Sequence, residues 1–336
     1  MTVTPYSLTV VIPVFNEAAE IGGTLAALDS ALSATSFAAD VVVVDDGSSD
    51  GSAAAVQAAR LETPLQLLAQ ENQGRFEARR AGIEHAEGDF CLLLDSRVRI
   101  DPGALAYLEQ RLQAGPEEQV WNAHVDIERE GNPYGVFWDV LTRRAYWTYF
   151  REPRTTSFGL DDFDRFPKGT TCFLAPRDLL LAATAAFRSS YDDPRFANDD
   201  APLIRWLAGR VPINISPSFS CRYPSRRRLG PFLRHAFHRG TVFVDGHGHR
   251  NAGWFPIVVG LFAGSAGCLA LALRRPLATI SAATAATSAA GAAVALSEGR
   301  AADAPTMAWV TPLYASAHIA GMWRGLFMRV RTRAEA

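Results

Sequence analysis

Short apolar runs alternate with helical patterns over the first hundred residues, and this alternation constrains the fold more than any other feature. The runs are Leu8–Val14, Val41–Val44, Leu65–Leu68 and Phe90–Leu94. Continuous apolar runs indicate strands that are covered on both faces, as in a parallel sheet. Helical patterns lie between and after them, namely Ile21, Leu25, Leu28 and Leu32 at helical spacing, then Arg75–Ala86 and Gly103–Ala114. This order predicts a doubly wound α/β sheet.

Polar residues gather where the predicted strands end. The first run leads into Pro13–Glu17, and the second leads into Asp45–Gly51. Ligands of open α/β sheets bind at the carboxyl ends of the strands. Carboxylates at such ends can accept hydrogen bonds from a base imide or from ribose hydroxyls. The same residues are also ordinary helix caps, as for Asp46, so each segment alone leaves both interpretations open.

Residues 115–168 lose the alternation and are rich in aromatic and charged residues. We expect long loops here, lying over a binding face. Regular structure should resume with a strand at Thr170–Leu174 and a helix from about Pro176 to Phe187.

Charge, cysteine content and the first residues exclude several classes of protein. The net charge of −2 gives no cation excess for nucleic acid. The four cysteines have no paired spacing, which argues against a zinc site or disulfide scaffold and fits a reducing compartment. No basic and apolar leader precedes the first strand, so we expect no cleavable signal peptide and a cytoplasmic first domain.

The chain becomes rich in Ala, Gly, Leu and Val from Gly253 onward. Gly253–Leu273 and Leu277–Leu296 carry no charge, and a third stretch, Met307–Met328, is interrupted by Arg324. Each is long enough to cross a bilayer, which takes about 20 residues as a helix. A buried helical hairpin is the alternative, but the remaining chain offers no core large enough for it. Basic residues on both sides favour two crossings and one interfacial segment.

A basic segment precedes the apolar region. Leu229, Phe232, Leu233, Ala236 and Phe237 would share one helical face, and basic residues fill the rest. This pattern predicts an amphipathic helix on an anionic membrane surface. The expected division is therefore a catalytic domain at 1–225, a membrane-surface segment at 226–252 and a hydrophobic region at 253–336 with two or three membrane helices.

Three segments together resemble the glycosyltransferase family 2 pattern, in order and at the usual separations. They are TVVIPVFNEAAEIGGTL, VVVVDDGSSDGS and ENQGRFEARRAGIEHAEGDFCLLLD, and the resemblance covers about residues 8–210. It implies the GT-A fold, a Rossmann-like, doubly wound mixed sheet, and an inverting nucleotide-sugar transferase. It also implies that Pro13, Glu17, Asp45 and Asp46 surround the nucleoside, with Arg75 or Arg79 within reach of the nucleotide.

The next motif departs from the family. Members usually end the fourth strand with Asp-x-Asp, whose last Asp ligates Mg²⁺ or Mn²⁺, whereas this strand ends Leu94-Asp95-Ser96-Arg97. Asp95 matches the first Asp, facing ribose or the metal shell, and a guanidinium at position 97 offers no oxygen ligand. Arg97 would replace the metal by pairing with the diphosphate. Alternatively a metal stays, held by Asp95 and another carboxylate with Arg97 turned outward, or the site has decayed.

Asn198-Asp199-Asp200-Ala201-Pro202-Leu203 resembles the family's Glu-Asp motif. Asp199 would take the place of Glu, and Asp200 that of the catalytic Asp. An acceptor hydroxyl needs a carboxylate to remove its proton, and a second nearby charge can raise the pKa of that carboxylate. Asp199 would also cap the following helix.

Many family members carry an Arg- or Gln-rich motif that covers the leaving diphosphate. Arg234, His235, His238 and Arg239 are the matching candidates. Cations there would stabilise the charge of the leaving group.

The sequence therefore predicts an enzyme that moves a sugar from a nucleotide-sugar, most commonly a UDP-sugar in similar proteins. The acceptor would be a hydroxyl or phosphate of a lipid-linked or cell-envelope glycan, at the cytoplasmic face of the inner or plasma membrane. The alternatives are a non-catalytic nucleotide- or sugar-binding membrane protein that keeps the fold, and a hydrolase of nucleotide diphosphate sugars.

Overall fold

The computed structural model describes residues 6–115, 117–248 and 255–335. The chain divides into two compact units. Unit 1 comprises residues 1–126, 148–188 and 199–224, and unit 2 comprises residues 127–147, 189–198 and 225–336. Two short inserts, 127–147 and 189–198, belong with the C-terminal region, and no local pattern in the sequence predicts this.

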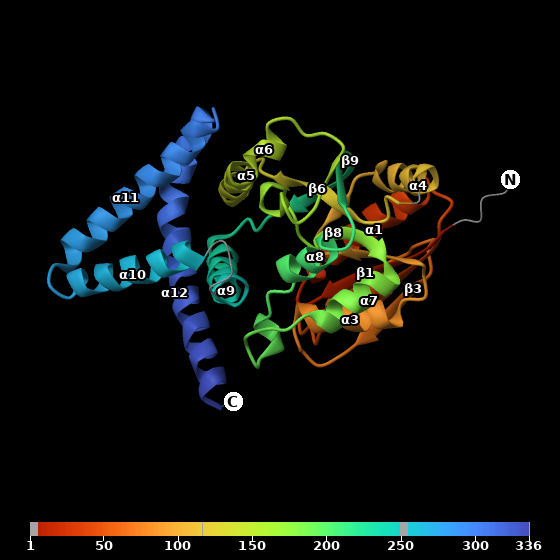
Figure 1. Cartoon of the computed structure of the whole chain (residues 1–336), viewed down its shortest axis with the longest axis horizontal. Coiled ribbons are helices and arrows are strands. Elements are labelled where there is room, and N and C mark those ends of the chain that lie inside the picture. The colour runs from red at the N-terminus through yellow and green to blue at the C-terminus, as the bar shows by residue number, and fades with distance from the viewer. Residues whose placement is uncertain (1–5, 116, 249–254, 336) are drawn as a thin grey trace. The chain divides into compact units, whose positions relative to one another are not determined.

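A mixed sheet forms the centre of unit 1 (Figure 1). Its described strands are β1 Ser7–Val14, β2 Ala38–Asp45, β3 Leu65–Ala69, β4 Phe90–Leu94, β5 Arg99–Ile100, β6 Trp121–Glu128, β7 Thr156–Phe158, β8 Cys172–Pro176 and β9 Ile213–Pro224. They run in the order β3-β2-β1-β4-β8-β6-β9-β5, with β7 beside β9. The first four are parallel, and β8 joins β4 antiparallel. The prediction of a doubly wound mixed sheet is confirmed.

Helices cover both faces of the parallel strands because successive side chains point to opposite faces. Val10 and Ile12 pack in one apolar cluster, whereas Val11 packs in another. The first cluster includes α1 (Ala18–Leu32) and α4 (Ala104–Ala114), and the second includes α3 (Arg75–His85), α7 (Arg177–Ala186) and α8 (Asp200–Ala208). A short helix, α2 (Ser52–Ala58), follows β2. All these layers leave the carboxyl ends of β1, β2 and β4 at one edge of the sheet.

The expectation of long loops over residues 115–168 is wrong. This region forms β6, α5 (Pro133–Ala145), α6 (Trp147–Phe150), β7 and a 3-10 turn, η1 (Phe163–Arg165). Helix α5 starts at a capping signal, since the Asn132 side chain accepts a hydrogen bond from the Tyr134 N–H at 3.2 Å and Pro133 follows it. Its aromatic residues are core residues, because Phe137 packs with Phe232 inside unit 2.

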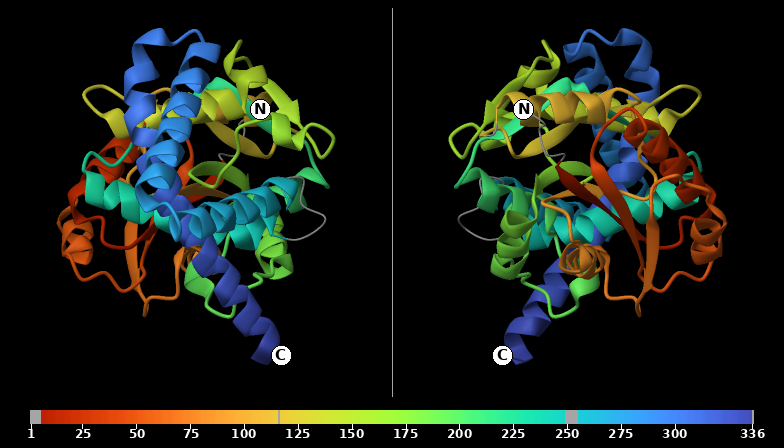
Figure 2. Two further views of the ribbon diagram at one scale, coloured as in Figure 1. Left: turned by 90° about the vertical axis from the view of Figure 1, so that its left-hand side faces the viewer. Right: turned by 90° about the vertical axis from the view of Figure 1, so that its right-hand side faces the viewer.

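Unit 2 is helical. Besides α5, it contains η2 (Pro194–Phe196), α9 (Leu229–His247), α10 (Phe255–Ala272), α11 (Pro276–Ser297), η3 (Ala301–Asp303) and α12 (Ala304–Glu335). Helix α12 packs along α9 and α11. Figure 2 shows the last turns of α12 running out to the C-terminus. Helices α9 and α12 cross where both carry glycine. A Cβ at Gly240 would lie 2.0 Å from the His318 carbonyl oxygen, and one at Gly321 would lie 1.9 Å from that of Phe237.

Two helices in the described part of the chain are long and apolar enough to cross a membrane. They are α10, with a mean hydropathy of 2.0, and α11, with a mean hydropathy of 1.4. Their side chains are mostly exposed in the structure, as with Leu269 and Ile280. An exposed apolar surface of this kind favours a lipid environment. The third apolar stretch lies in α12, which packs against α9 and α11.

The predicted amphipathic helix is present as α9, but its apolar face is not available for a membrane surface. Phe232 and Ala236 are fully buried within unit 2, where Phe232 stacks on Tyr134 with ring centroids 4.5 Å apart. Only Leu229, at the first turn, remains exposed. The apolar periodicity is therefore that of a helix that packs on α5 and α12. Residues 249–252 of the predicted segment lie outside the described residues.

Candidate functional site

The polar edge of the sheet brings together most of the residues that the sequence singled out. Pro13 is buried in β1, and Glu17 is the residue directly before α1. Asp45 ends β2, and Asp95 directly follows β4. These strands are parallel neighbours, so their carboxyl ends lie side by side.

Asp46 holds the loop that leads into α3. Its carboxylate is buried and accepts hydrogen bonds from Gln70 Nε2 at 2.7 Å, the Gln73 N–H at 2.9 Å and the Gly74 N–H at 2.8 Å. Gly74 has a φ of 93°, a conformation that favours glycine. Asp46 therefore fixes the start of the helix that carries Arg75 and Arg79. Its neighbour Asp45 accepts a hydrogen bond from the Ser48 N–H at 3.0 Å.

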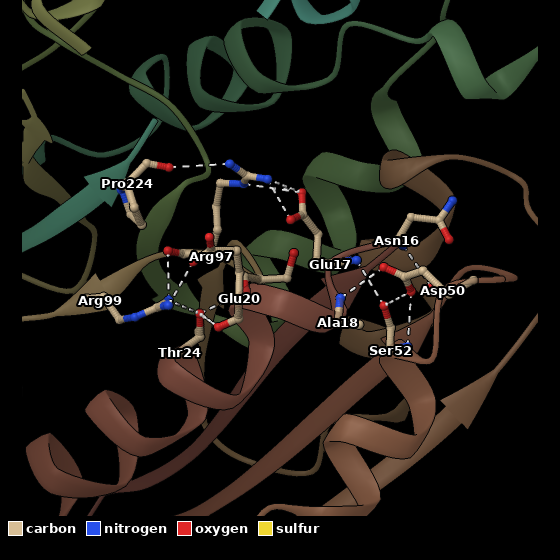
Figure 3. A network of polar contacts seen from close by, with 12 residues as sticks. Asn16, Glu17, Ala18, Glu20, Thr24, Asp50, Ser52, Arg97, Arg99 and Pro224 are labelled. Carbon is tan, nitrogen blue, oxygen red and sulfur yellow. Dashed lines mark hydrogen bonds and ion pairs between the residues drawn. The ribbon is translucent and has the colours of Figure 1, made fainter. Parts of the chain in front are cut away.

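Asp50 joins the first turns of two helices. It accepts hydrogen bonds from the Ala18 N–H at 3.0 Å and from the Ser52 hydroxyl at 2.5 Å (Figure 3). Burial raises the pKa of Asp50, but the bonds from Ser52 and Ala18 outweigh it and bring this pKa below its ordinary value. The loops after β1 and β2 are thus tied to each other before any ligand binds.

Arg97 lies against Glu17. One alternative expected its side chain to turn outward to solvent, and it does not. Its Nη2 donates to Glu17 Oε1 at 2.6 Å and to Oε2 at 2.5 Å, and its Nε lies 3.2 Å from Oε1 (Figure 3). Its Nη1 donates to the Pro224 carbonyl at 3.3 Å. The side chain is 14 % exposed. A carboxylate on one edge and a carbonyl beyond it hold the guanidinium in place.

Arg79 is buried and pairs with three carboxylates. Its Nη2 donates to Asp95 at 2.7 Å, and its Nη1 donates to Asp199 at 2.8 Å and to Asp200 at 2.9 Å. The Arg79 side chain is 2 % exposed, and that of Asp199 is 1 % exposed. One buried cation therefore links α3, the end of β4 and the start of α8.

Asp200 is held by three donors. Besides Arg79, it accepts a hydrogen bond from Arg75 Nη2 at 3.0 Å and one from the Thr170 hydroxyl. Burial alone would raise the pKa of Asp200, but the charges of Arg75 and Arg79 and the bond from Thr170 hold this pKa well below its ordinary value. The expectation that a second carboxylate raises the pKa of Asp200 is therefore wrong, because two arginines donate hydrogen bonds to its carboxylate.

Three partners in this site carried no local signal in the sequence. Thr170 meets Asp200 across 30 positions, and Pro224 meets Arg97 across 127. Gln70 meets Asp46 across 24 positions. Only the fold brings such pairs together.

The described residues do not fit a divalent cation bound as the family motif implies. Arg97 takes the usual ligand position and is bound to Glu17, and Asp95 is bound to Arg79. Among the residues that the structure describes, no group of three or more His, Cys, Asp or Glu side chains is arranged to hold a metal ion. Such ions need several oxygen ligands at one point.

The basic candidates after the sheet lie on α9, in unit 2. Arg234, His238 and Arg239 are exposed there. The Arg239 guanidinium lies 4.9 Å from the centre of the Trp138 ring. Their role at a diphosphate stays a prediction.

The Glycosyl transferase family 2 model matches residues 9–180, about half of the chain. Among curated proteins, the chain is 34 % identical over 114 residues to the undecaprenyl-phosphate 4-deoxy-4-formamido-L-arabinose transferase of Aeromonas hydrophila, covering 32 % of this chain and 34 % of that one. The transferase of the same name from Shewanella sediminis is 31 % identical over 111 residues, which again cover 32 % of this chain and 34 % of that one. The chain thus matches about a third of the length of these relatives.

Solved structures show the same fold at low identity. A mannosyltransferase, PcManGT of Pyrobaculum calidifontis, in complex with GDP-Man and Mn²⁺, aligns with a TM-score of 0.56 at 20 % identity, over 97 % of this chain and 88 % of that one. Residues 1–349 of TarS of S. aureus, in complex with UDP-GlcNAc, align with a TM-score of 0.51 at 15 % identity, over 95 % and 91 %. The chain therefore belongs to glycosyl transferase family 2, a family of glycosyltransferases, and is built on the GT-A fold.

Proposed function

We propose that this protein is an inverting glycosyltransferase that moves a sugar from a nucleotide-sugar to the phosphate of a membrane lipid. Family membership supports the reaction class. The curated relatives are named for transfer involving undecaprenyl phosphate, and α10 and α11 are apolar enough to lie in the membrane that holds such lipids. A uridine nucleotide-sugar is the donor class that we would test first.

The low pKa of Asp200 and its contacts favour a phosphate over a hydroxyl as the acceptor. A hydroxyl must lose its proton to a base as it attacks, and an effective base has a pKa near the working pH. Asp200 has a pKa well below its ordinary value and is held by Arg75, Arg79 and Thr170. It is therefore a poor base. A phosphate monoester has a second pKa of about 6, so at neutral pH it is ionised and can attack without a base.

Arg75 is the group best placed to meet such an acceptor. Its side chain is 48 % exposed, yet its Nη2 is fixed by Asp200 at 3.0 Å and Asp199 at 3.4 Å. A guanidinium with one edge held by carboxylates can offer its remaining N–H groups to phosphate oxygens. Asp199 and Asp200 thus act as positioning residues for Arg75 and Arg79.

The reaction is then one in-line displacement. A phosphate oxygen of the lipid forms a bond to the anomeric carbon of the donor sugar. The bond from that carbon to the diphosphate breaks on the opposite side, and the nucleoside diphosphate leaves with the electron pair. No proton is transferred, and the configuration at the anomeric carbon inverts. Asp95, Asp45, Pro13 and Glu17 lie on the edge of the sheet where the donor would bind.

The membrane arrangement completes the proposal. Helices α10 and α11 would cross the bilayer as a pair joined at Arg274 and Arg275, with unit 1 at the cytoplasmic face of the inner or plasma membrane. Residues 1–225 would form the catalytic domain, except that 127–147 and 189–198 pack with the C-terminal helices. A product attached to a lipid phosphate fits a role in building cell-envelope glycans.

A second candidate is a nucleotide- or sugar-binding protein without catalysis. The observation that favours it is that three donors already occupy Asp200. It predicts donor binding without turnover.

The test is sugar transfer by the purified full chain in vesicles that contain undecaprenyl phosphate or undecaprenol. UDP-sugars and GDP-sugars are supplied in turn, and lipid-linked sugar is measured. We expect product with the phosphate and none with the alcohol. Equal or faster transfer to the alcohol contradicts the proposal. Binding of donor without product supports the second candidate, and free sugar released without acceptor indicates a hydrolase.

A further inference from the structure

The arginine at the family's metal-ligating position is a built part of the site. Arg97 makes three contacts to Glu17 through Nε and Nη2, and one to the Pro224 carbonyl through Nη1. Glu17 lies directly before α1, beside the carboxyl end of β1. A side chain that had lost its role would more often be exposed, whereas this one is 14 % exposed.

The carboxylates that could bind a cation already pair with the buried Arg79. Asp95 would be the remaining ligand of the motif, and it accepts from Arg79 at 2.7 Å. Arg79 also binds Asp199 and Asp200, and it is almost completely buried. A divalent cation bound by these carboxylates would displace the Arg79 guanidinium. In the described part of unit 1, these three carboxylates are the partners to which Arg79 donates.

The diphosphate of the donor nevertheless needs positive charge. The Nε–Nη2 edge of Arg97 is held by Glu17, and its Nη1 donates to the Pro224 carbonyl. A phosphate that meets Arg97 can displace Glu17 from the Nε–Nη2 edge, and this edge then gives bidentate hydrogen bonds to phosphate oxygens.

We propose that Arg97 is the cation that faces the donor diphosphate in this protein, and that donor binding needs no divalent metal. Glu17 is then the positioning residue that holds the guanidinium ready. This inference rests on the proposed function, since it assumes a nucleotide-sugar donor. It makes this chain a metal-independent member of a fold in which the same position commonly carries a metal ligand.

The experiment is calorimetric titration of the full chain in detergent with UDP and with GDP, once with Mn²⁺ and once with EDTA. We expect the wild type to bind one of them with the same Kd under both conditions. Arg97→Asp restores the Asp-x-Asp spacing. It should bind at least about tenfold more weakly in EDTA, because a charge-assisted pair is lost, and should recover affinity with Mn²⁺. Arg97→Lys keeps the charge and loses the fork, so it should bind more weakly without metal dependence.

Arg99→Asp is the matched control. Arg99 lies two residues further on, and its Nη2 pairs with Glu20 at 2.9 Å, so both Asp variants place a carboxylate beside a glutamate. Binding by Arg99→Asp should stay independent of metal. The melting temperature of each variant checks that it is folded, and the conservative Arg97→Lys variant keeps the test informative if Arg97→Asp does not fold.

Two results overturn the inference and leave the proposed function intact. One is wild-type binding that is lost in EDTA and restored by Mn²⁺. The other is an Arg97→Asp variant that binds in EDTA as tightly as the wild type. Failure of the wild type to bind any nucleotide, with or without Mn²⁺, contradicts the proposed function itself.

Discussion

Arg79 of α3 and Asp199 at the start of α8 form an ion pair of 2.8 Å in which both side chains are almost completely buried. The same guanidinium binds Asp95, so the end of β4 is joined to both helices. The polar edge of the sheet therefore depends on one buried cation.

Arg79→Met should cost about 3–5 kcal/mol, because it removes the nearest cation from the buried Asp199 and the arginine that pairs with Asp95. Hydrogen exchange of the α3 and α8 peptides in the full chain measures this loss. Arg80→Met is the control, since Arg80 is 47 % exposed and its ion pairs with Glu77 and Glu84 lie on the surface of the same helix. It should change stability by less than about 1 kcal/mol. Equal effects of the two substitutions would contradict the role of Arg79.

Asp245 of α9 organises the segment that leads to Asp199. Its carboxylate is buried and accepts from the Ser189 hydroxyl at 3.0 Å, from the N–H and hydroxyl of Ser190 at 2.7 and 2.5 Å, and from the Asn198 N–H at 2.8 Å. Asp245→Ala leaves these donors unsatisfied, at about 1–3 kcal/mol for each buried one. We expect the variant to be cut faster by trypsin at Arg195 and to lose transfer activity.

Asp193→Ala is the control for this segment. Asp193 pairs with Arg195 at 2.7 Å, and its side chain is 30 % exposed. It should alter cleavage far less than Asp245→Ala. A cleavage rate at Arg195 that is the same in wild type and Asp245→Ala would show that Asp245 does not hold the segment.

Gly321 allows α12 to cross α9 at backbone contact. A Cβ there would lie 1.9 Å from the Phe237 carbonyl oxygen, which cannot move aside as a side chain would. Gly321→Val should therefore lower stability by about 3 kcal/mol or more, seen as a lower melting temperature in detergent. Gly260→Val is the control, because nothing lies within 4 Å of its Cβ position in α10. Similar melting temperatures for both variants would rule out this tight crossing.

The order of strands and helices in unit 1 follows from the sequence because its signals are local. The run at Phe90–Leu94 is β4, and the spacing of Ile21, Leu25 and Leu28 is that of α1. β4 is buried along its whole length and α1 buries one face, so the hydrophobic pattern alone marks both. The two uncharged stretches form α10 and α11, whose length and apolar composition mark them in the sequence.

The rest depends on contacts between residues far apart in the chain. Phe137 looked like part of an aromatic loop because its partner, Phe232, lies 95 positions later. The three carboxylates around Arg79 come from the end of β4 and from α8, and no local pattern states that they share one guanidinium. The direction of the shift in the pKa of Asp200 depends in the same way on which charges contact it in space.

The most direct test of the central claim, attack by a lipid phosphate without a base, is the pH dependence of kcat/KM for transfer to undecaprenyl phosphate, in the wild type and in Asp200→Asn. The pKa of Asp200 lies well below its ordinary value of about 4, so its carboxylate stays ionised above that pH and contributes no change there. We predict that activity falls below a pH of about 6, where the acceptor phosphate gains a proton, and that Asp200→Asn keeps this acidic limb at a reduced rate. An acidic limb that vanishes in Asp200→Asn, with a rate loss of about 10²–10⁴-fold, would show that Asp200 is the general base and would contradict the account.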